Sequence, residues 1–160
     1  MSLFSLWQIE EFISKRDFTG AMALLEFKKR AGEVDEATLL WLAYSAFHLG
    51  DYDKALEVYQ EILDQNNDNR HNQTLLYMGC CYYYLGQYDE AMKCAQKAPD
   101  SDPLKVRLLF HTAHRMGDED KLLKFHQQLS ERKEDQLALA AVHYMRGHFQ
   151  EVNEVAPVTK

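Results

Sequence analysis

Proline and glycine are scarce in this chain, which has 3 prolines and 7 glycines among 160 residues. Because proline is excluded from helix interiors and both residues mark turns, their scarcity predicts a mostly helical protein with short connections. No apolar run is long enough to span a bilayer, and the N-terminal stretch lacks the basic segment of a signal peptide. We therefore expect a soluble, cytoplasmic protein without membrane insertion.

Positive charge is also in short supply, with 18 Lys and Arg against 25 Asp and Glu and a net charge of −7. Nucleic acids and anionic membranes bind concentrated basic patches, so neither is expected as a partner. The longest basic run, Lys28-Lys29-Arg30, is expected at a helix C-terminus, where it complements the dipole. The 3 cysteines, Cys80, Cys81 and Cys94, include no CxxC pair and are predicted to pack reduced, as small apolar residues.

A glycine turn followed at once by an amphipathic helix recurs along the chain. In residues 49–59, Gly50 can end one helix with a positive φ, and Tyr52, Ala55 and Tyr59 then share one face of the next helix. Equivalent glycines follow at Gly86, Gly117 and Gly147, while Arg16 takes this place in the first unit. Five units align on residues spaced 34, 36, 31 and 30 apart: Ala21, Ala55, Ala91, Leu122 and Val152.

A second helical pattern precedes each of these glycines, as in Leu39-x-x-Leu42-Ala43-x-x-Ala46 before Gly50. Apolar residues at i, i+3, i+4 and i+7 mark a helix buried along one stripe, so each unit is predicted to be a helix–turn–helix hairpin. A two-helix period near 34 residues resembles the tetratricopeptide repeat. The sequence thus predicts an all-α fold, a right-handed superhelix (an α-solenoid) of about five units with the last one incomplete.

A single repeat array over residues 1–160 is expected, with units at approximately 2–35, 36–71, 72–102, 103–132 and 133–157. The predicted helices lie at 3–14, 18–30, 36–49, 53–65, 72–85, 87–98, 104–116, 119–131, 134–146 and 149–155. After Val152 the chain reaches Pro157 before a full second helix can form. Because a stacked array normally ends in a polar capping helix, we expect a piece of a longer array or an end capped by a partner. Self-association through this open end is left open.

The first helix of each hairpin is predicted to line a groove that binds a partner protein through aromatic anchors. The groove positions are predicted at Leu40, Tyr44, Phe47, His48, Leu76, Cys80, Tyr83, Tyr84, Arg107, His111, His114, Arg115, Leu137, Tyr144 and Met145. The main candidates for partner binding are Tyr44, Phe47, His48, Tyr83, Arg107, His111, His114 and Tyr144. This surface is predicted to be apolar and aromatic in its first half and to carry basic and imidazole side chains in its second. The alternative, that the aromatic residues pack between neighbouring repeats, remains open.

No residue pattern points to catalysis or to a cofactor. His111 and His114 are adjacent on one helix, but no HExxH motif or matching carboxylate accompanies them, so helix packing or partner contact is expected rather than a metal site. No GxSxG motif or phosphate-binding glycine loop is present, so an enzyme is not expected. Leu40, Tyr44, Leu76 and Cys80 cannot clamp a carboxylate, which disfavours binding of chaperone C-terminal tails.

Several runs of residues go beyond the generic repeat. They include Ser14-Lys15-Arg16-Asp17-Phe18-Thr19-Gly20-Ala21, Ala46-Phe47-His48-Leu49-Gly50-Asp51-Tyr52 and His143-Tyr144-Met145-Arg146. The chain thereby resembles the tetratricopeptide subunit of intraflagellar transport complex B, a family also called tetratricopeptide repeat protein twenty-six or DYF-thirteen. The resemblance covers roughly residues 9–152. The basic N-terminal extension and the many further repeats typical of the family are missing, which implies an N-terminal fragment, short isoform or truncated copy.

This resemblance implies a non-catalytic adaptor or scaffold that acts in cilium assembly and ciliary protein transport. The implied partners are other subunits of the complex and ciliary cargo proteins. The implied locations are the cytoplasm, the cilium or flagellum and the basal body. The alternative is a general cytosolic tetratricopeptide adaptor, linked to chaperones or to another complex.

Overall fold

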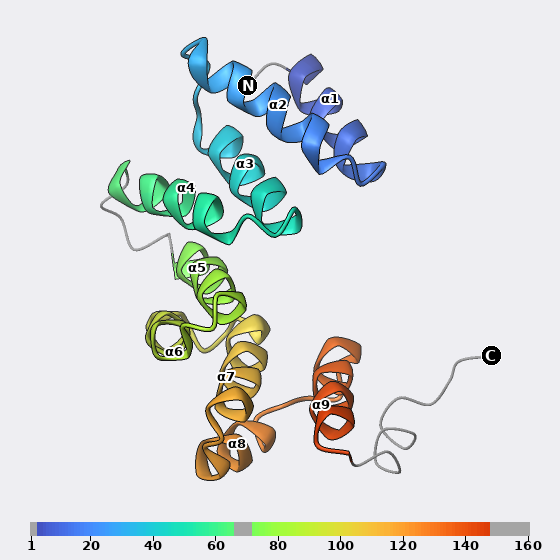
Figure 1. Cartoon of the computed structure of the whole chain (residues 1–160), viewed down its shortest axis with the longest axis vertical. Helices are drawn as coiled ribbons and strands as arrows, with labels where there is room; N and C mark the ends of the chain where they lie inside the picture. Colours follow the sequence, from blue (N-terminus) through green and yellow to red (C-terminus); the bar gives the residue numbers. More distant parts are fainter. Residues whose placement is uncertain (1–2, 66–71, 148–160) are drawn as a thin grey trace, which may run out of the picture.

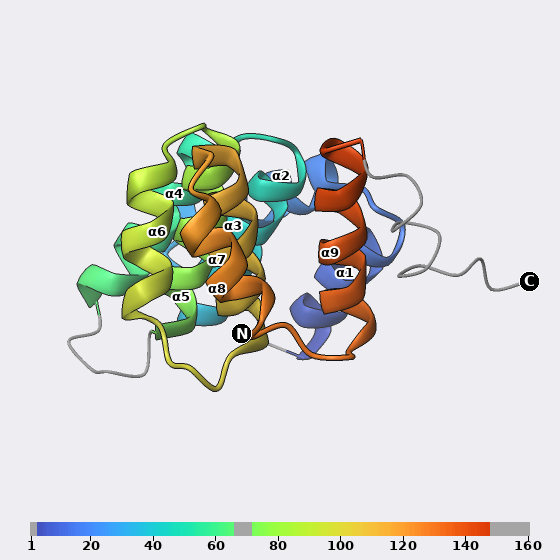
Figure 2. The same ribbon diagram turned by 90° about the horizontal axis from the view of Figure 1, so that it is seen from below.

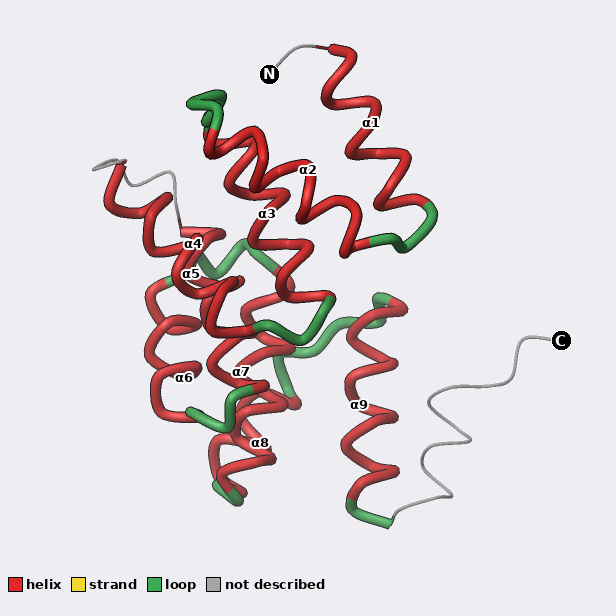
Figure 3. Tube along the Cα trace, turned by 45° about the horizontal axis from the view of Figure 1, so that its top comes forward, coloured by secondary structure: helices red, strands yellow, loops and turns green. Residues whose placement is uncertain are grey.

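The computed structural model describes residues 3–65 and 72–147, and the regular structure of this part is helical throughout (Figures 1 and 3). The helices follow one another as a staggered row rather than a closed bundle (Figure 1). Their bounds are α1 (Leu3–Ser14), α2 (Phe18–Arg30), α3 (Glu36–His48), α4 (Tyr52–Gln65), α5 (Asn72–Tyr84), α6 (Tyr88–Lys97), α7 (Pro103–Met116), α8 (Glu119–His126) and α9 (Lys133–Met145).

In each hairpin, the turn between the two helices lies at the position that the spacing of the repeats predicts. Gly50, Gly86 and Gly117 have φ values of 81°, 76° and 69°, and Gly147 ends α9 with a φ of 78°. Arg16 adopts the same left-handed conformation with a φ of 56°, although it carries a Cβ. Side chains bearing a Cβ adopt this region only at a cost, so the first turn is strained where the others are not.

An aspartate after the turn starts the second helix of three hairpins. The carboxylate of Asp17 accepts from the Gly20 N–H at 2.8 Å, that of Asp51 from Lys54 at 3.1 Å, and that of Asp118 from Lys121 at 3.0 Å. These caps satisfy backbone donors that the first turn of a helix leaves without an intrahelical acceptor. Because the turn residue ends one helix and the capping aspartate starts the next, the connection between the two helices of each of these hairpins is short.

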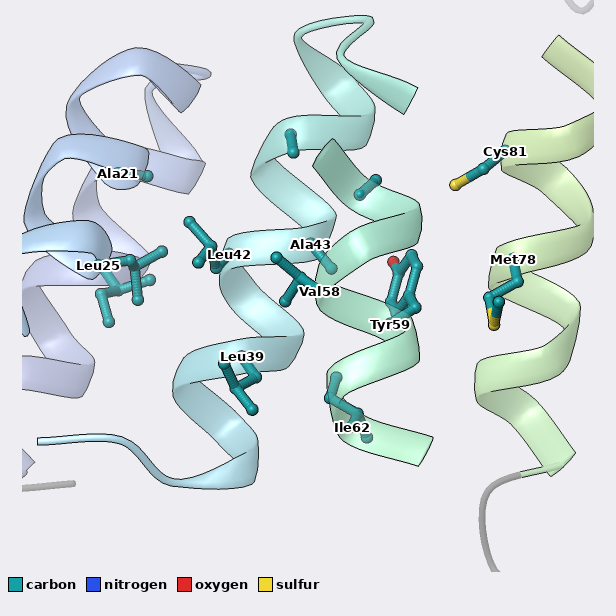
Figure 4. Packing of buried hydrophobic residues seen from close by; sticks show 13 residues of the cluster. Ala21, Leu25, Leu39, Leu42, Ala43, Val58, Tyr59, Ile62, Met78 and Cys81 are labelled. Carbon is teal, nitrogen blue, oxygen red and sulfur yellow. The ribbon is translucent and has the colours of Figure 1, made fainter. Parts of the chain in front are cut away.

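The buried core runs along the array between the two helices of each hairpin and their neighbours. Leu25 of α2, Leu42 of α3 and Val58 of α4 are fully buried and point toward one another, and Tyr59 faces α5 (Figure 4). Full burial of one such aliphatic side chain stabilises the fold by roughly 1.5–3 kcal/mol. Each of α2, α4 and α6 therefore packs both on its own hairpin partner and on the first helix of the next hairpin.

This regular packing changes at α8, which is shorter than predicted. The expected helix at 119–131 ends at His126, because Gln128 and Leu129 donate to carbonyls only three residues back and the helix closes. In both views α9 lies to one side of the hairpin of α7 and α8 (Figures 1 and 2). It packs on α7 and meets α8 at the ion pair between Arg146 and Glu119. The other predicted helix bounds agree to within a residue, except that the expected helix at 149–155 lies outside the described residues.

Candidate functional site

The first helices of successive hairpins line an open groove. A cavity of about 680 Å³ lies between α3 and α5, bordered by α1 and α7, and a second of about 370 Å³ lies among α5, α7 and α9. Cys80 of α5 and Leu104 of α7 line both cavities, so the two adjoin each other. We call the residues lining the two cavities together the groove.

Six of the eight main candidates predicted for partner binding line this groove. Tyr44, Phe47 and His48 line the first cavity, and Tyr83, Arg107 and His111 line the second. His114 lines neither cavity, and its Nδ1 atom is buried without a hydrogen-bond partner among the described residues. Tyr144 is 62% exposed near the end of α9 and also lies outside both cavities. The tertiary arrangement thus brings the first six together and leaves the last two apart.

Leu76 is a wrong prediction, because it belongs to the core. It is fully buried in a cluster with Leu108, Leu109 and Phe110 of α7. On α5 the groove side is taken by Tyr77 and Cys80 instead. Successive residues of a helix point about 100° apart, so an error of one position moves a side chain from the groove into the core. Arg115 and Met145, also predicted for the groove, line neither cavity.

The aromatic residues of the groove also pack on one another, as the packing alternative predicts, while partner binding by the same residues stays a prediction. Tyr44 meets Trp41 edge-on at 5.6 Å between ring centroids and lies 4.3 Å from the His48 ring. Phe47 and Tyr84, from neighbouring hairpins, meet at 5.5 Å. Tyr44 nevertheless stays 37% exposed and Tyr84 58% exposed. Rings held by such contacts are pre-organised, which lowers the entropy lost when a partner packs on their free faces.

Sequence reasoning missed part of the groove floor. Trp41, Tyr59 and Tyr77 line the first cavity together with the polar Gln73 and Thr74. Trp41 lies four residues after Ala37 and three before Tyr44, which both line the cavity, so extending that helical spacing could have identified it. Tyr59 comes from a second helix of a hairpin, and no pattern within a single helix shows that its ring reaches the groove.

The groove carries less positive charge than the sequence predicted. Burial lowers the pKa of His48, and the charge of Arg16 lowers it further. Burial also lowers the pKa of His111, with smaller contributions from His114 and Arg107. Both imidazoles are therefore neutral at pH 7. Arg107 donates from Nη1 to the Asp135 carboxylate at 2.9 Å, so its charge is compensated.

Asp135 links α9 to α7 through its ion pair with Arg107. It is 3% exposed and accepts hydrogen bonds from the Ser130 N–H at 2.9 Å and the Ser130 hydroxyl at 2.6 Å, besides that from Arg107. Burial by itself raises the pKa of this carboxyl, but the Ser130 hydrogen bonds and Arg107 outweigh it, and the net pKa is lowered. Asp135 is therefore ionised at neutral pH and positions the Arg107 guanidinium at the groove wall.

The described part of the groove contains no reactive thiol and no candidate metal site. Burial raises the pKa of Cys80 to about 11 and that of Cys81 to about 12, so both stay protonated and poorly nucleophilic at neutral pH. Among residues 3–65 and 72–147, no three His, Cys, Asp or Glu side chains are grouped so that they could hold a metal ion. No helix in this part of the chain combines the length and the apolar character needed to cross a membrane. The aromatic and apolar side chains that line the groove can pack against another surface.

Comparison with known sequences gives a specific relationship. The sequence profile of intraflagellar transport protein 56 matches residues 39–157. The intraflagellar transport protein 56 homolog of Caenorhabditis elegans is 38% identical over 152 residues, which are 92% of this chain. The same alignment covers 26% of that relative, so the chain spans about a quarter of its length.

Comparison with solved structures gives the fold. A thermophilic tetratricopeptide-repeat protein of Thermus thermophilus is similar with a TM-score of 0.74 at 18% identity, over 96% of this chain and 91% of that one. MamA of Desulfovibrio magneticus RS-1 is similar with a TM-score of 0.72 at 16% identity, over 95% and 89% of the two chains. At identities this low, the likeness shows an α-solenoid of tetratricopeptide type and nothing about partners.

Proposed function

Because this chain belongs to the family of intraflagellar transport protein 56, we propose that it serves as a non-catalytic scaffold within the intraflagellar transport B complex. In this role the groove holds a segment of another subunit of the complex or of a ciliary cargo protein. The observation that carries the proposal is the pair of adjoining cavities lined by α3, α5, α7 and α9, in which aromatic rings are held by contacts with one another.

Large aromatic side chains in a partly formed cavity are typical anchors of protein interfaces. Tyr44 and Tyr84 stay partly exposed in the groove, although their rings also pack on neighbouring aromatic residues, with Tyr84 stacked on Tyr52. Burial raises the pKa of the Cys80 thiol to about 11, so this groove residue is protonated and a poor nucleophile at neutral pH. These features favour binding over catalysis.

A general chaperone adaptor is the weaker candidate. Chaperone tails end in a carboxylate, which a tetratricopeptide groove would clamp with free cationic side chains. Among the described residues, Arg107 is the only Lys or Arg that lines either cavity, and it is already engaged with Asp135. The described part of the groove therefore offers no site of suitable chemistry for such a tail.

The test is affinity purification of the tagged chain from ciliated cells, followed by mass spectrometry. We expect intraflagellar transport B subunits with the natural chain and their loss with Tyr44→Gln and Tyr84→Gln, which remove two exposed groove rings. Phe27→Gln is the matched control, because Phe27 is an exposed aromatic residue outside the groove. Circular dichroism checks that all variants stay helical. Recovery of no transport subunit, or equal recovery with groove and control variants, contradicts the proposal.

We further propose that the chain acts at the cilium, which its family membership supports, with the basal body and cytoplasm as further locations. Self-association through the C-terminal end remains a prediction. Sedimentation equilibrium tests it, and a single monomeric species at micromolar concentration would refute it.

A further inference from the structure

Helix α9 forms a wall of two different cavities. On one side it borders the second cavity of the groove, and on the other a cavity of about 230 Å³, the α8–α9 cavity, lies between it and α8. The residues of α9 on the groove side are Glu134, Leu137, Ala138 and Ala141. Those on the side of the α8–α9 cavity are Leu139, Val142, His143 and Arg146. Because successive helical residues point about 100° apart, the two sets face in roughly opposite directions.

The α8–α9 cavity is closed at its floor and open at its rim. Phe110 of α7, Leu122 of α8 and Val142 of α9 are buried in one cluster. Leu123 of α8, in contrast, is 60% exposed, and Leu139 of α9 is only half-buried. These two leucines line the cavity from the helices on either side of it. Since protein interiors seldom leave voids larger than a water molecule, α8 and α9 are packed incompletely.

The residue equivalent to Leu123 is better covered in each of the preceding hairpins. Met22, Leu56 and Met92 hold this position, one residue after the residue on which the units align. Met22 and Leu56 are partly buried against the core, and Met92 is 6% exposed. The exposure of Leu123 is therefore a property of the α8–α9 junction and not of the repeat position.

The residue equivalent to Leu139 shows the same difference on the other side of the cavity. Leu42, Met78 and Leu109 hold this position, each at the same distance before its turn glycine as Leu139 before Gly147. All three are buried. The two helices thus keep apolar surface uncovered at the positions where the other hairpins pack on one another.

The two ends of α9 are held with different strength. At its start, the buried Asp135 carboxylate accepts from Arg107 of α7 at 2.9 Å and from the Ser130 hydroxyl at 2.6 Å. Near its end, Arg146 meets Glu119 of α8 at 3.2 Å, with side chains that are 34% and 69% exposed. Breaking a buried ion pair is costly, whereas an exposed pair contributes little. The start of α9 is therefore the fixed end, and its last turns are the part that can shift.

We propose that α9 is a movable wall of the groove. It pivots about Asp135 between the position in Figure 2 and a packed position, in which Leu139 meets Leu123 and the α8–α9 cavity closes. Burial of the two leucines favours the packed position, and loss of part of the present packing on α7 opposes it. Because α9 borders the groove on its other side, the same movement widens the second cavity. Admission of a partner segment by this widening rests on the proposed function, whereas the movement itself requires no partner.

Double electron–electron resonance on the full chain measures the movement. Spin labels attach to a ketone-bearing amino acid placed at Met145 near the end of α9 and at Gln96 on α6, so that the natural cysteines stay in place. Labels at Gln60 on α4 and Gln96 form the control pair, which joins two helices of the regularly packed part. We expect two distances between positions 145 and 96 and one distance for the control pair. A single distance between positions 145 and 96, as narrow as that of the control pair, overturns the proposal.

Substitutions separate the packed position from general flexibility at the end of the chain. Leu123→Ser removes an apolar side chain that is largely exposed in the present position and covered only in the packed one. The population of the second distance should therefore fall at least about threefold. Leu137→Ser is the matched control, because Leu137 is 52% exposed on the groove side of α9 and is not covered by α8 in the packed position. A second population that is unchanged in Leu123→Ser, or that falls equally in Leu137→Ser, contradicts the proposal.

The same measurements distinguish failure of this proposal from failure of the proposed function. If two distances are found and Leu123→Ser removes one of them while no transport subunit is recovered from cells, the movable wall stands and its place in the transport complex is wrong. If transport subunits are recovered while only one distance is found, the function stands and α9 is a fixed wall.

Discussion

Replacement of Asp135 should release α9 from the array while the preceding hairpins stay folded. In Asp135→Ala, the Arg107 guanidinium loses its carboxylate, and the Ser130 N–H and hydroxyl lose their acceptor. The Asp135 side chain is 5% exposed and that of Arg107 is 21% exposed. The cost arises mainly from polar groups left without partners, because the methyl group of alanine cannot replace any of these bonds.

The expected destabilisation is about 3 kcal/mol, at the lower end of the range for breaking a buried ion pair, since water reaches part of Arg107. Asp135→Asn keeps an acceptor oxygen of similar shape and should cost about 1–2 kcal/mol. The pKa of Asp135 is lowered in the folded chain, so its stabilisation is fully present above the ordinary Asp pKa and is lost as the pH falls through the folded value. The difference between the natural chain and Asp135→Asn should therefore be largest near pH 7 and should shrink in acid.

Hydrogen exchange measured by mass spectrometry is the suited assay, because repeat arrays can open one unit at a time. Amides of α9 should lose protection in Asp135→Ala, whereas those of α3 to α6 should keep it. Glu119→Gln is the control, since its ion pair with Arg146 at 3.2 Å joins α8 to the end of α9 with both side chains more than a third exposed, and such pairs contribute at most about 1 kcal/mol. Unchanged protection of α9 in Asp135→Ala, or an equal loss in Glu119→Gln, would refute the reasoning.

Three further predictions concern the turns, the histidines and the cysteines. Arg16→Gly should raise the free energy of unfolding, measured by urea denaturation, by about 1 kcal/mol, because it removes the strain at the φ of 56°. Gly86→Ala, at a φ of 76°, should lower it by a similar amount. A destabilised Arg16→Gly variant would contradict this prediction. Acidification from pH 7 to pH 5 should lower the free energy of unfolding, because three histidines have a lower pKa in the folded chain than in the unfolded chain, which therefore binds protons first. These residues are His48, His111 and His114, and substituting any one of them should flatten the pH profile of stability. Cys80 and Cys81 should react with iodoacetamide at pH 8 far more slowly in the folded chain than in urea, because burial raises the pKa of both thiols; equal rates would show that these thiols are accessible.

Local patterns account for the features that the sequence predicted well. The regular spacing of the glycines predicted the left-handed turns at Gly50, Gly86 and Gly117, because glycine adopts a positive φ more readily than a residue with a Cβ. Helix bounds followed from the 3.6-residue period and from capping residues such as Asp51. The one clear error in a helix bound, at α8, came from extending the repeat past His126, where no cap or breaker residue marks the end.

The groove could be predicted only in part. Six of the eight main candidates line it, because groove positions recur with the repeat. Leu76 was misplaced because a helical period does not distinguish adjacent positions near the border of a buried stripe. Tyr59 was missed because its position in the groove depends on how α4 packs against α5.

The sequence by itself determined the hairpin unit, its repetition and the family to which the chain belongs, because all three reside in residues close together along the chain. Only the tertiary structure decided the charge of the groove. The pairing of Arg107 with Asp135 joins residues 28 positions apart, and the neutrality of His48 and His111 follows from burial that depends on neighbouring helices. A side chain's ionisation depends on what surrounds it in space, so imidazoles and a guanidinium that suggest positive charge in the sequence are neutral or paired once the chain folds.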